Sequence, residues 1–378
     1  MQLITTTFDR SRGWSRPLPR ELDSERTLLI VFGSTEYLDD PEPLLELKKS
    51  FPQSHVIGCS TSGEIHGGII SDGTLSVAAL QLGSGSLRTT TASVPDGAQS
   101  FAAGERIARD LSADDLRGIL VLSEGLTVNG TELAQGIDSS VPRGTIVTGG
   151  LAGDGSRFSR TWVMDGNGPR QHIVTAVGLY GPSLRIGYGS RGGWDIFGPE
   201  RTITRSEANV LFELDGRPAL ELYKTYLGDR ASGLPATALL FPLCVTSPKE
   251  KTRTLVRTVL SIDEEKQSMT FAGDVPQGWK GQLMRANFDR LIDGASSAAS
   301  MVDVQANGSP TLAIAISCVG RRLVLGDRTE EEVEATLDAL PEGCQLIGFY
   351  SYGELSPLGQ GSCELHNQTM TLTTLTEA

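Results

Sequence analysis

The chain is poor in the side chains that build disulfide frameworks and metal centres. Its 378 residues include five cysteines and four histidines, and aromatic residues make up only 6%. The cysteines are odd in number and scattered, which predicts reduced thiols and not a disulfide framework. No C-x-x-C or H-x-x-x-H spacing occurs, so the sequence predicts no zinc site.

Long apolar runs and a targeting segment are also absent. The first twenty residues contain no apolar stretch typical of a signal peptide. The longest apolar runs, such as Leu28–Phe32, have the length of a strand and fall far short of a membrane span. The formal net charge is −13, from 33 basic and 46 acidic residues, and an acidic chain repels phosphate backbones. We therefore expect a cytoplasmic protein with no membrane insertion and no nucleic-acid partner.

One pattern of secondary structure recurs along the chain. Residues 27–65, 118–155 and 311–355 each show a buried strand, a loop, a helix, a second strand and a glycine-containing turn. A strand–helix–strand connection between parallel neighbours is right-handed. The sequence therefore predicts an α/β fold with mixed sheets, built from duplicated strand–helix–strand units in two pseudo-related halves.

The segments between the repeats predict further strands and helices. Leu75–Leu82 and Ser86–Val94 alternate apolar and polar residues around a glycine-rich turn, which predicts a hairpin. A short helix is expected at Pro218–Tyr226 and a long one at Lys280–Met301. The break between the two halves is expected near Gly198–Ala208.

Two of the repeats end in turns that carry the same residues at the same offsets. IGCSTSGEI at residues 57–65 aligns with IGFYSYGEL at residues 347–355. Ligands of α/β sheets commonly bind beyond the carboxyl ends of strands. Backbone N–H and hydroxyl groups there can hold a carboxylate, while Glu64 or Glu354 can hold an ammonium group. This predicts a pocket framed by both turns for an amino acid or a related metabolite. The alternative is that each glutamate only accepts hydrogen bonds from its own turn.

Other residues are weaker candidates. GGLAGDG at 149–155 is followed by an expected strand and not by the helix that a dinucleotide site needs, so a tight turn is favoured, and Asp154 is kept as a candidate to face the pocket. Arg321 is a candidate clamp for a ligand carboxylate, and Arg322 is expected to pair with acidic residues. The candidate ligand-binding residues are Cys59, Ser60, Thr61, Ser62, Gly63, Glu64, Gly150, Asp154, Arg321, Ser351, Tyr352, Gly353 and Glu354.

Nucleophilic catalysis has little support in the residues. Cys59 stands at a strand end, but no G-x-S-x-G elbow surrounds it, and a buried thiol is the favoured interpretation. A Cys- or Ser-dependent hydrolase needs a general base near Cys59, Ser60 or Ser62. We therefore expect no enzyme and assign no catalytic residue.

Six motifs in a fixed order carry a family resemblance. They are GCSTSGEI (58–65), GGLAGDG (149–155), LFELDGRPALELYKTYLG (211–228), SC-x-GRR (317–322), GFYSYGEL (348–355) and HNQTMTLTTL (366–375). The set resembles a FIST protein with N-terminal and C-terminal FIST domains in tandem, over residues 27–375. The resemblance implies an N-terminal extension (1–26), a FIST N-terminal-like domain (27–208) and a FIST C-terminal-like domain (209–378).

The resemblance also implies a role. FIST proteins are regarded as sensory modules of bacterial signal transduction that bind small ligands, with amino acids the usual suggestion. No output domain is visible in the chain, so we expect a separate partner such as a histidine kinase. One stand-alone branch that this layout resembles senses nitric oxide through haem. For that alternative His66 and His366 are the candidate axial ligands, although residues 185–199 carry no histidine. We expect no cofactor otherwise.

Overall fold

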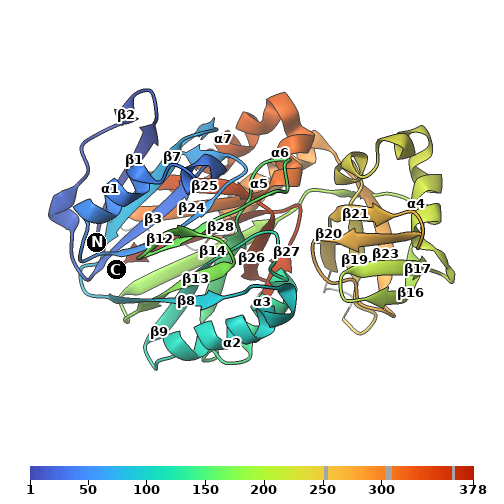
Figure 1. The fold of residues 1–378 in the computed structure, drawn as a ribbon, viewed down its shortest axis with the longest axis horizontal. Coiled ribbons are helices and arrows are strands. Elements are labelled where there is room, and N and C mark those ends of the chain that lie inside the picture. Colours follow the sequence, from blue (N-terminus) through green and yellow to red (C-terminus); the bar gives the residue numbers. More distant parts are fainter. Residues whose placement is uncertain (251–253, 303–308, 360–361) are drawn as a thin grey trace.

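The computed structural model describes residues 1–250, 254–302, 309–359 and 362–378. A large body contains three mixed sheets with helices on their outer faces, and a smaller module, rich in strands, stands to one side of it (Figure 1). The module is inserted in the chain between strand β14 (Leu184–Arg191) and helix α5 (Phe288–Ser300), both of which belong to the large body. The prediction of a mixed α/β fold is confirmed. No helix among the described residues is long and apolar enough to cross a membrane.

The predicted repeat occurs three times in the large body. The first unit contains β1 (Gln2–Asp9), β3 (Thr27–Gly33), α1 (Glu42–Ser50), β4 (His55–Ser60), β5 (Glu64–His66), β6 (Ile69–Ser71) and β7 (Leu75–Gln81), with β2 (Gly13–Trp14) at the edge. The second contains β8 (Ser86–Ser93), α2 (Ser100–Leu111), β9 (Leu116–Ser123), α3 (Gly130–Asp138), β10 (Ile146–Leu151), β11 (Val163–Asp165), β12 (Gly168–Arg170) and β13 (Ile173–Tyr180). The third contains β14 (Leu184–Arg191), β24 (Thr311–Cys318), α6 (Val319–Leu325), α7 (Thr329–Ala339), β25 (Cys344–Ser351), β26 (Gly353–Pro357), β27 (Cys363–His366) and β28 (Met370–Glu377).

Each unit forms one sheet on the same plan. The two strands joined by a helical connection are parallel in every unit, as β3 with β4, β9 with β10 and β24 with β25. The last strand of the unit then returns antiparallel beside the first of the pair. Three copies of one arrangement therefore describe the large body more fully than two halves do.

The units are joined by an exchange of strands around a closed ring. The strand that follows each turn does not return to its own sheet. β11 of the second unit pairs with β4, β26 of the third pairs with β10, and β5 of the first pairs with β25. Each sheet therefore holds an antiparallel pair of strands from the next unit, β11 with β12, β26 with β27, or β5 with β6. The exchange also fixes the register, and it places Glu64 and Glu354 at equivalent positions, with Val163 as their counterpart in the second unit.

A glycine stands at the same register in the middle of each second parallel strand. A Cβ atom added to Gly58, Gly149 or Gly348 would lie 2.5, 1.8 or 2.0 Å from a backbone carbonyl oxygen of the neighbouring strand. No side chain fits at that distance, because a carbon and an oxygen atom in contact need more than 3 Å. These glycines allow the parallel strands to approach at the point where each turn begins.

A shared apolar core holds the three sheets together. One cluster of buried side chains includes Ile30 and Ile57 of the first unit, Leu122 of the second, and Ile314 and Phe349 of the third. Strands buried on both faces read as continuous apolar runs, which explains why these strands were visible in the sequence. The core brings the carboxyl ends of the parallel strands toward one region of the body.

The small module is built on a strongly bent antiparallel sheet. Its elements are β15 (Asp195–Ile196), β16 (Arg201–Glu207), β17 (Val210–Leu214), β18 (Arg217–Pro218), α4 (Ala219–Leu227), β19 (Leu243–Thr246), β20 (Thr254–Arg257), β21 (Val259–Asp263), β22 (Ser268–Phe271) and β23 (Lys280–Arg285). The predicted helix at 218–226 corresponds to α4. The module begins next to the predicted break at 198–208 and packs α4 on its own separate core.

Two predictions about local structure are wrong. The strands at 75–82 and 86–94 exist, but β7 pairs with β1 and β3 while β8 pairs with β13 of another sheet, so they form no hairpin. The long helix predicted at 280–301 is β23 followed by α5. Residues 280–285 pair with β19 and β16, and the helix begins only after Asn287, whose side chain accepts a hydrogen bond from the N–H of Arg290.

Candidate functional site

The three turns that follow the second parallel strands meet in the interior of the large body. Each turn donates one backbone hydrogen bond to the next turn, so that the bonds form a closed ring. They run from the N–H of Ser62 to the carbonyl of Tyr350 (2.8 Å), from Gly153 to Ser60 (3.0 Å) and from Tyr352 to Leu151 (3.1 Å). The turns at 58–65 and 348–355 are therefore in direct contact, and the turn at 149–155 completes the ring.

Glu64 is buried at the first turn and is held by three donors. Its exposed fraction is 2%. One carboxylate oxygen accepts from the Thr61 hydroxyl, and the other accepts from the N–H (2.9 Å) and hydroxyl (2.8 Å) of Thr74. Burial raises the pKa of Glu64 to about 7, against the lowering effect of these hydrogen bonds. The carboxyl group therefore titrates near neutral pH.

Glu354 has the same environment in the third unit. One oxygen accepts from the Ser351 hydroxyl at 2.7 Å, and the other accepts from the N–H (3.2 Å) and hydroxyl (2.8 Å) of Thr369. The side chain is fully buried, and burial raises the pKa of Glu354 to about 8. The hydroxyl three residues before each glutamate and the threonine before the last strand are thus repeated features of the two units. Both glutamates order their own turns, as the capping alternative expects.

The second unit lacks this glutamate and has an insertion in its place. Val163 occupies the equivalent register, and the inserted loop is organised by Asp154, which is 1% exposed. The Asp154 carboxylate accepts from the backbone N–H groups of Phe158, Ser159 and Arg160, each at 2.9 Å, and from the hydroxyl of Tyr352. Asp154 and Tyr352 therefore join the second turn to the third.

A polar pocket of about 460 Å³ opens beside the first turn. We call it the polar pocket; its lining residues are Ser34, Glu36, Thr61, Ser62, Gly63, Glu64, Asp72, Gly73, Asp154, Gly155, Ser156 and Arg157. Of the predicted site residues, Thr61, Ser62, Gly63, Glu64 and Asp154 come together here. The remaining lining residues were not predicted. Gly155 ends the GGLAGDG motif and Ser156 and Arg157 follow it, whereas Ser34 and Glu36 follow β3, and Asp72 and Gly73 precede β7, outside the glycine-containing turn motifs.

The charges around the polar pocket are mostly negative. Four carboxylates line it against one guanidinium, that of Arg157. Arg157 is paired with Glu36 at 2.6 Å, and Arg322 reaches Asp72 from outside the lining at 2.7 Å. Among the described residues, neither Glu64 nor Asp154 forms a salt bridge, although the charges of Arg322 and Arg157 act on them from nearby. The pocket therefore favours a cationic group near these two carboxylates.

A second hollow, of about 550 Å³, adjoins the polar pocket through Ser62 and Gly155. It is bounded by helix α6 and includes Arg322. The guanidinium of Arg322 donates to the carbonyl of Ser62 and to both oxygens of Asp72. Arg322, which was expected to pair with the acids at 330–334, instead holds the wall between the two hollows.

Several predicted site residues lie in the core and not at a cavity. Arg321 is fully buried and pairs with Glu332 at 2.6 Å, while its other N–H groups donate to backbone carbonyls, including that of Leu291 at 2.8 Å. Cys59 is fully buried, and burial raises the pKa of its thiol well above the ordinary value. Ser60 is also buried and accepts from the N–H of Trp162 at 3.0 Å. Gly150 faces the core side chains of the third unit. Ser351, Gly353 and Glu354 line none of the cavities described for the chain.

The two histidines proposed for haem do not meet at a common cavity. His366 is 7% exposed, and its Nε2 atom lies 3.0 Å from the carbonyl oxygen of Ser356. Nδ1 of His66 lies 3.3 Å from the Ser76 hydroxyl. Neither histidine lines a described pocket, and no cluster of three metal-ligating side chains occurs in the described part of the chain. Neither histidine therefore faces a described cavity in which it could bind haem iron as an axial ligand. Haem binding stays a prediction, which absorption spectroscopy would test.

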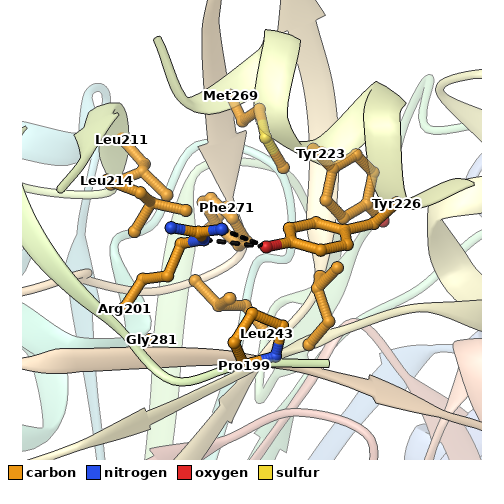
Figure 2. A pocket seen from close by; sticks show the side chains of 11 residues that line it. Pro199, Arg201, Leu211, Leu214, Tyr223, Tyr226, Leu243, Met269, Phe271 and Gly281 are labelled. Atoms are coloured by element: carbon orange, nitrogen blue, oxygen red, sulfur yellow. Dashed lines mark hydrogen bonds between the residues drawn. The ribbon is translucent and has the colours of Figure 1, made fainter. Parts of the chain in front are cut away.

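A small hollow in the module is part of its core. Figure 2 shows the Arg201 guanidinium donating to the Tyr226 hydroxyl above a lining of apolar side chains. The hollow has room for about 20 Å³, little more than one water molecule needs. We therefore do not assign it to a small ligand.

The comparisons with known proteins identify the family of the chain. The chain matches the FIST N domain over residues 27–217 and the FIST C domain over residues 219–357. It therefore belongs to the FIST family, as the motifs predicted, and FIST domains are associated with ligand binding in sensory signal transduction. No curated protein matches the chain. Among solved structures it shows a likeness to cyanuric acid hydrolase from A. caulinodans, with 12% identity over 78% of this chain and 99% of that chain. The TM-score of that likeness is 0.18, so it carries no argument.

Proposed function

We propose that the protein is a sensor that binds a small molecule with an ammonium group, such as an amino acid or a related metabolite, in the polar pocket. The observation that supports this most is Glu64. It is a buried carboxyl group just beyond the carboxyl end of the parallel strand β4, it lines a cavity of about 460 Å³, and among the described residues it forms no salt bridge. Such strand ends are where α/β sheets usually bind ligands.

The rest of the lining suits the other end of such a ligand. The Arg157 guanidinium is about half exposed; it pairs with Glu36 and donates through Nε to the carbonyl of Asp154 at 2.8 Å, so its remaining N–H groups can donate to a ligand carboxylate. The Ser62 hydroxyl, which accepts from the N–H of Gly155 at 2.9 Å, belongs to the same lining as Arg157 and Glu64. Glu64 and Asp154 then hold the ammonium group.

We infer that the output is made by a separate protein, such as a histidine kinase. The family association with sensing supports a binding role and not a catalytic one. The geometry does not support a Cys-dependent hydrolase, because the Cys59 thiol is buried and burial raises its pKa. Ligand binding that stabilises one arrangement of the turns and the loop at 154–160 would supply the signal.

The test is a thermal-shift and calorimetric screen of amino acids and their decarboxylated amines against the full chain. A ligand at a hundredfold excess over its Kd stabilises the folded protein by about 2.7 kcal/mol. Glu64→Gln removes the charge that we assign to the ammonium group and should abolish the shift, while Glu354→Gln makes the same change at the equivalent position without altering the pocket lining and should keep it. Loss of the shift in both variants would support turn capping in place of ligand binding, and the absence of any shift in the folded wild type would refute the proposal.

The pH dependence gives a second readout. Burial raises the pKa of Glu64 to about 7, so part of the population is protonated at neutral pH and must lose that proton to bind a cation. Affinity should therefore rise between about pH 6 and pH 8 and then level off, until the ligand amine itself deprotonates. A pH-independent affinity across this range would show that Glu64 does not contact the ammonium group.

A further inference from the structure

Three exposed apolar side chains line one cleft between the large body and the small module. Leu126, Phe158 and Leu260 are 39%, 42% and 44% exposed, and all three face the same cleft of about 500 Å³. Leu126 and Phe158 belong to the second unit of the body, whereas Leu260 belongs to β21 of the module. We call this the interdomain cleft; single exposed apolar residues need no explanation, but a group that converges on one concave surface indicates a binding site.

The wall on the side of the large body is a stacked aromatic pair. The rings of Phe158 and Tyr352 lie 4.6 Å apart at 11° to each other, and both residues line the cleft. Tyr352 is mostly buried, so Phe158 presents the outer ring face. Offset-stacked rings at this distance attract each other, and a further flat ring can extend the stack.

Phe158 is held in this position by a backbone conformation that bulky residues rarely adopt. Its φ angle is +48°, in the left-handed region that is unfavourable for a residue with a large side chain. The N–H of Phe158 donates to the buried Asp154 carboxylate at 2.9 Å, which fixes the loop. An exposed aromatic ring on a strained loop adds little to the core, so its placement is better explained by binding.

Polar groups stand at the edge of the same cleft. Glu132 in the first turn of α3 lines it, and within the described ranges its carboxylate takes part in no hydrogen bond or ion pair. On the module side, the Asn209 amide donates to the carbonyl of Phe271 at 2.8 Å, which directs its amide oxygen away from that contact. Both groups can accept hydrogen bonds from a ligand.

Polar contacts join the two parts of the protein beside the cleft. The Asn129 amide donates to Asp274 at 3.3 Å, the N–H of Asp274 approaches the Thr131 hydroxyl at 3.4 Å, and the Arg257 guanidinium donates to the carbonyl of Leu365 at 3.1 Å. A molecule in the cleft would contact both parts at once. Such a molecule stabilises the arrangement in which both walls are in place.

We propose that the interdomain cleft is a second small-molecule site, which binds a planar aromatic compound that carries an amine or another N–H donor. The ring stacks on Phe158 between Leu126 and Leu260, and the donor faces Glu132. The volume of about 500 Å³ is in the range of small-molecule sites. The two cavities share no lining residue, although the Asp154 carboxylate that lines the polar pocket also holds Phe158 and Tyr352 of the cleft.

The experiment uses the full chain and four defined probes. Tryptamine carries both the ring and the amine, indole carries the ring with one N–H, and benzoate carries a ring with a negative charge. Propylamine has the amine without a ring. Saturation-transfer NMR reports which probe protons contact the protein, and calorimetry gives Kd. We expect the order of affinity tryptamine, indole, then benzoate, with no measurable binding of propylamine at this cleft.

Three single variants separate the cleft from a general loss of structure. Phe158→Ala removes the stacking face and should weaken tryptamine binding at least tenfold. Glu132→Gln should weaken tryptamine but not indole. Phe288→Ala removes a phenylalanine with the same 42% exposure from the surface outside this cleft and serves as the matched control.

The outcomes decide the proposal. If no aromatic probe binds the wild type at millimolar concentration, or if Phe158→Ala binds tryptamine as tightly as the wild type, the cleft is not an aromatic site. Equal losses in Phe158→Ala and Phe288→Ala would likewise overturn it, since the effect would then be global. Tryptamine binding that is lost in Glu64→Gln and retained in Phe158→Ala would place the probe in the polar pocket and refute the cleft.

Discussion

Replacing Glu64 with glutamine should make the stability of the protein less dependent on pH. In the folded state burial raises the pKa of Glu64 to about 7 from its ordinary value of 4.5. A carboxyl group whose folded pKa is raised supports the folded state fully below the ordinary value, and that support is lost as the pH rises through the folded pKa. Each unit of difference between the two pKa values is worth about 1.4 kcal/mol, so the loss amounts to about 3 kcal/mol by pH 8.

Glutamine can keep the hydrogen bonds that hold this side chain. The amide oxygen can take the two hydrogen bonds from Thr74, at 2.9 and 2.8 Å in the wild type, and the amide nitrogen can donate to the Thr61 hydroxyl. We therefore expect Glu64→Gln to match the wild type in stability near pH 4.5. Above pH 7 it should exceed the wild type by about 3 kcal/mol.

Urea unfolding at a series of pH values between about pH 5 and pH 9 measures this difference. Glu354→Gln serves as a comparison, because burial raises the pKa of Glu354 to about 8, and its gain should therefore level off about one pH unit higher. A difference between the wild type and Glu64→Gln that stays constant over the whole range would refute the reasoning. It would show that the Glu64 carboxyl group titrates at its ordinary pKa in the folded protein.

Two further predictions concern buried polar groups. Arg321→Met removes the ion-pair partner, at 2.6 Å, of the fully buried Glu332, which should lower the free energy of unfolding in urea by about 3–5 kcal/mol. Adding Glu332→Leu should restore much of that stability. If the double variant is no more stable than Arg321→Met, Arg321 stabilises the fold through its contacts with backbone carbonyls instead. Burial lowers the pKa of His366 to about 4 from 6.5, so its contribution is present above pH 6.5 and is lost as the pH falls toward 4. His366→Gln should reduce the loss of stability between pH 6.5 and pH 4. If the stability of the variant falls as steeply as that of the wild type, His366 does not cause that loss.

The elements of the large body could be predicted from sequence because their signals are local. Each first parallel strand is a continuous apolar run, and each second strand ends in a glycine-containing turn, so three copies of the unit are visible without a structure. The pairing of the strands is not local. β7 and β8 are consecutive and joined by a tight turn, yet they belong to different sheets. The reason is that the first strand of each unit pairs with the last strand of the same unit, and not with the last strand of the unit before it. Alternation predicts a strand but carries no information on its partner.

The predicted helix at 280–301 failed for a related reason. Residues 283, 284, 288, 291 and 292 are apolar at helical spacing, yet β23 takes the first two into the module and α5 takes the others onto the large body. The apolar positions were identified correctly, since Leu283, Met284 and Leu291 are buried. Leu283 packs in the core of the module, whereas Met284 and Leu291 share one cluster with Val324 and Leu325. A periodic pattern marks the buried positions but cannot show that the chain turns from a strand to a helix between them.

Only part of the candidate site could be predicted. A sequence motif marks the turn that it forms, but it does not show which residues from other strands face that turn. The Gly-Glu turns drew attention to Glu64 and Glu354, and both proved to be buried at equivalent positions. The polar pocket beside Glu64 also needs Ser34 and Asp72, which reach it from the ends of other strands. A lone serine after β3 has no signal in the sequence. It could have been found only by aligning all three units and asking which residue follows each first strand.

The departures from the threefold plan explain why the units have different cavities. Ser34, Glu124 and Cys318 stand at the ends of the first parallel strands, and each donates its backbone N–H to a residue at the start of the last strand of its unit, Thr74, Ile173 or Thr369. In the first unit Glu64 and its neighbours leave a polar pocket, whereas in the third unit Glu354 is sealed by its own donors. In the second unit a valine replaces the glutamate, and the inserted loop carries Phe158 outward to the interdomain cleft. Because the backbone plan is common to all three units, these substitutions and the insertion, and not the fold itself, decide which chemistry each strand end can offer to a ligand.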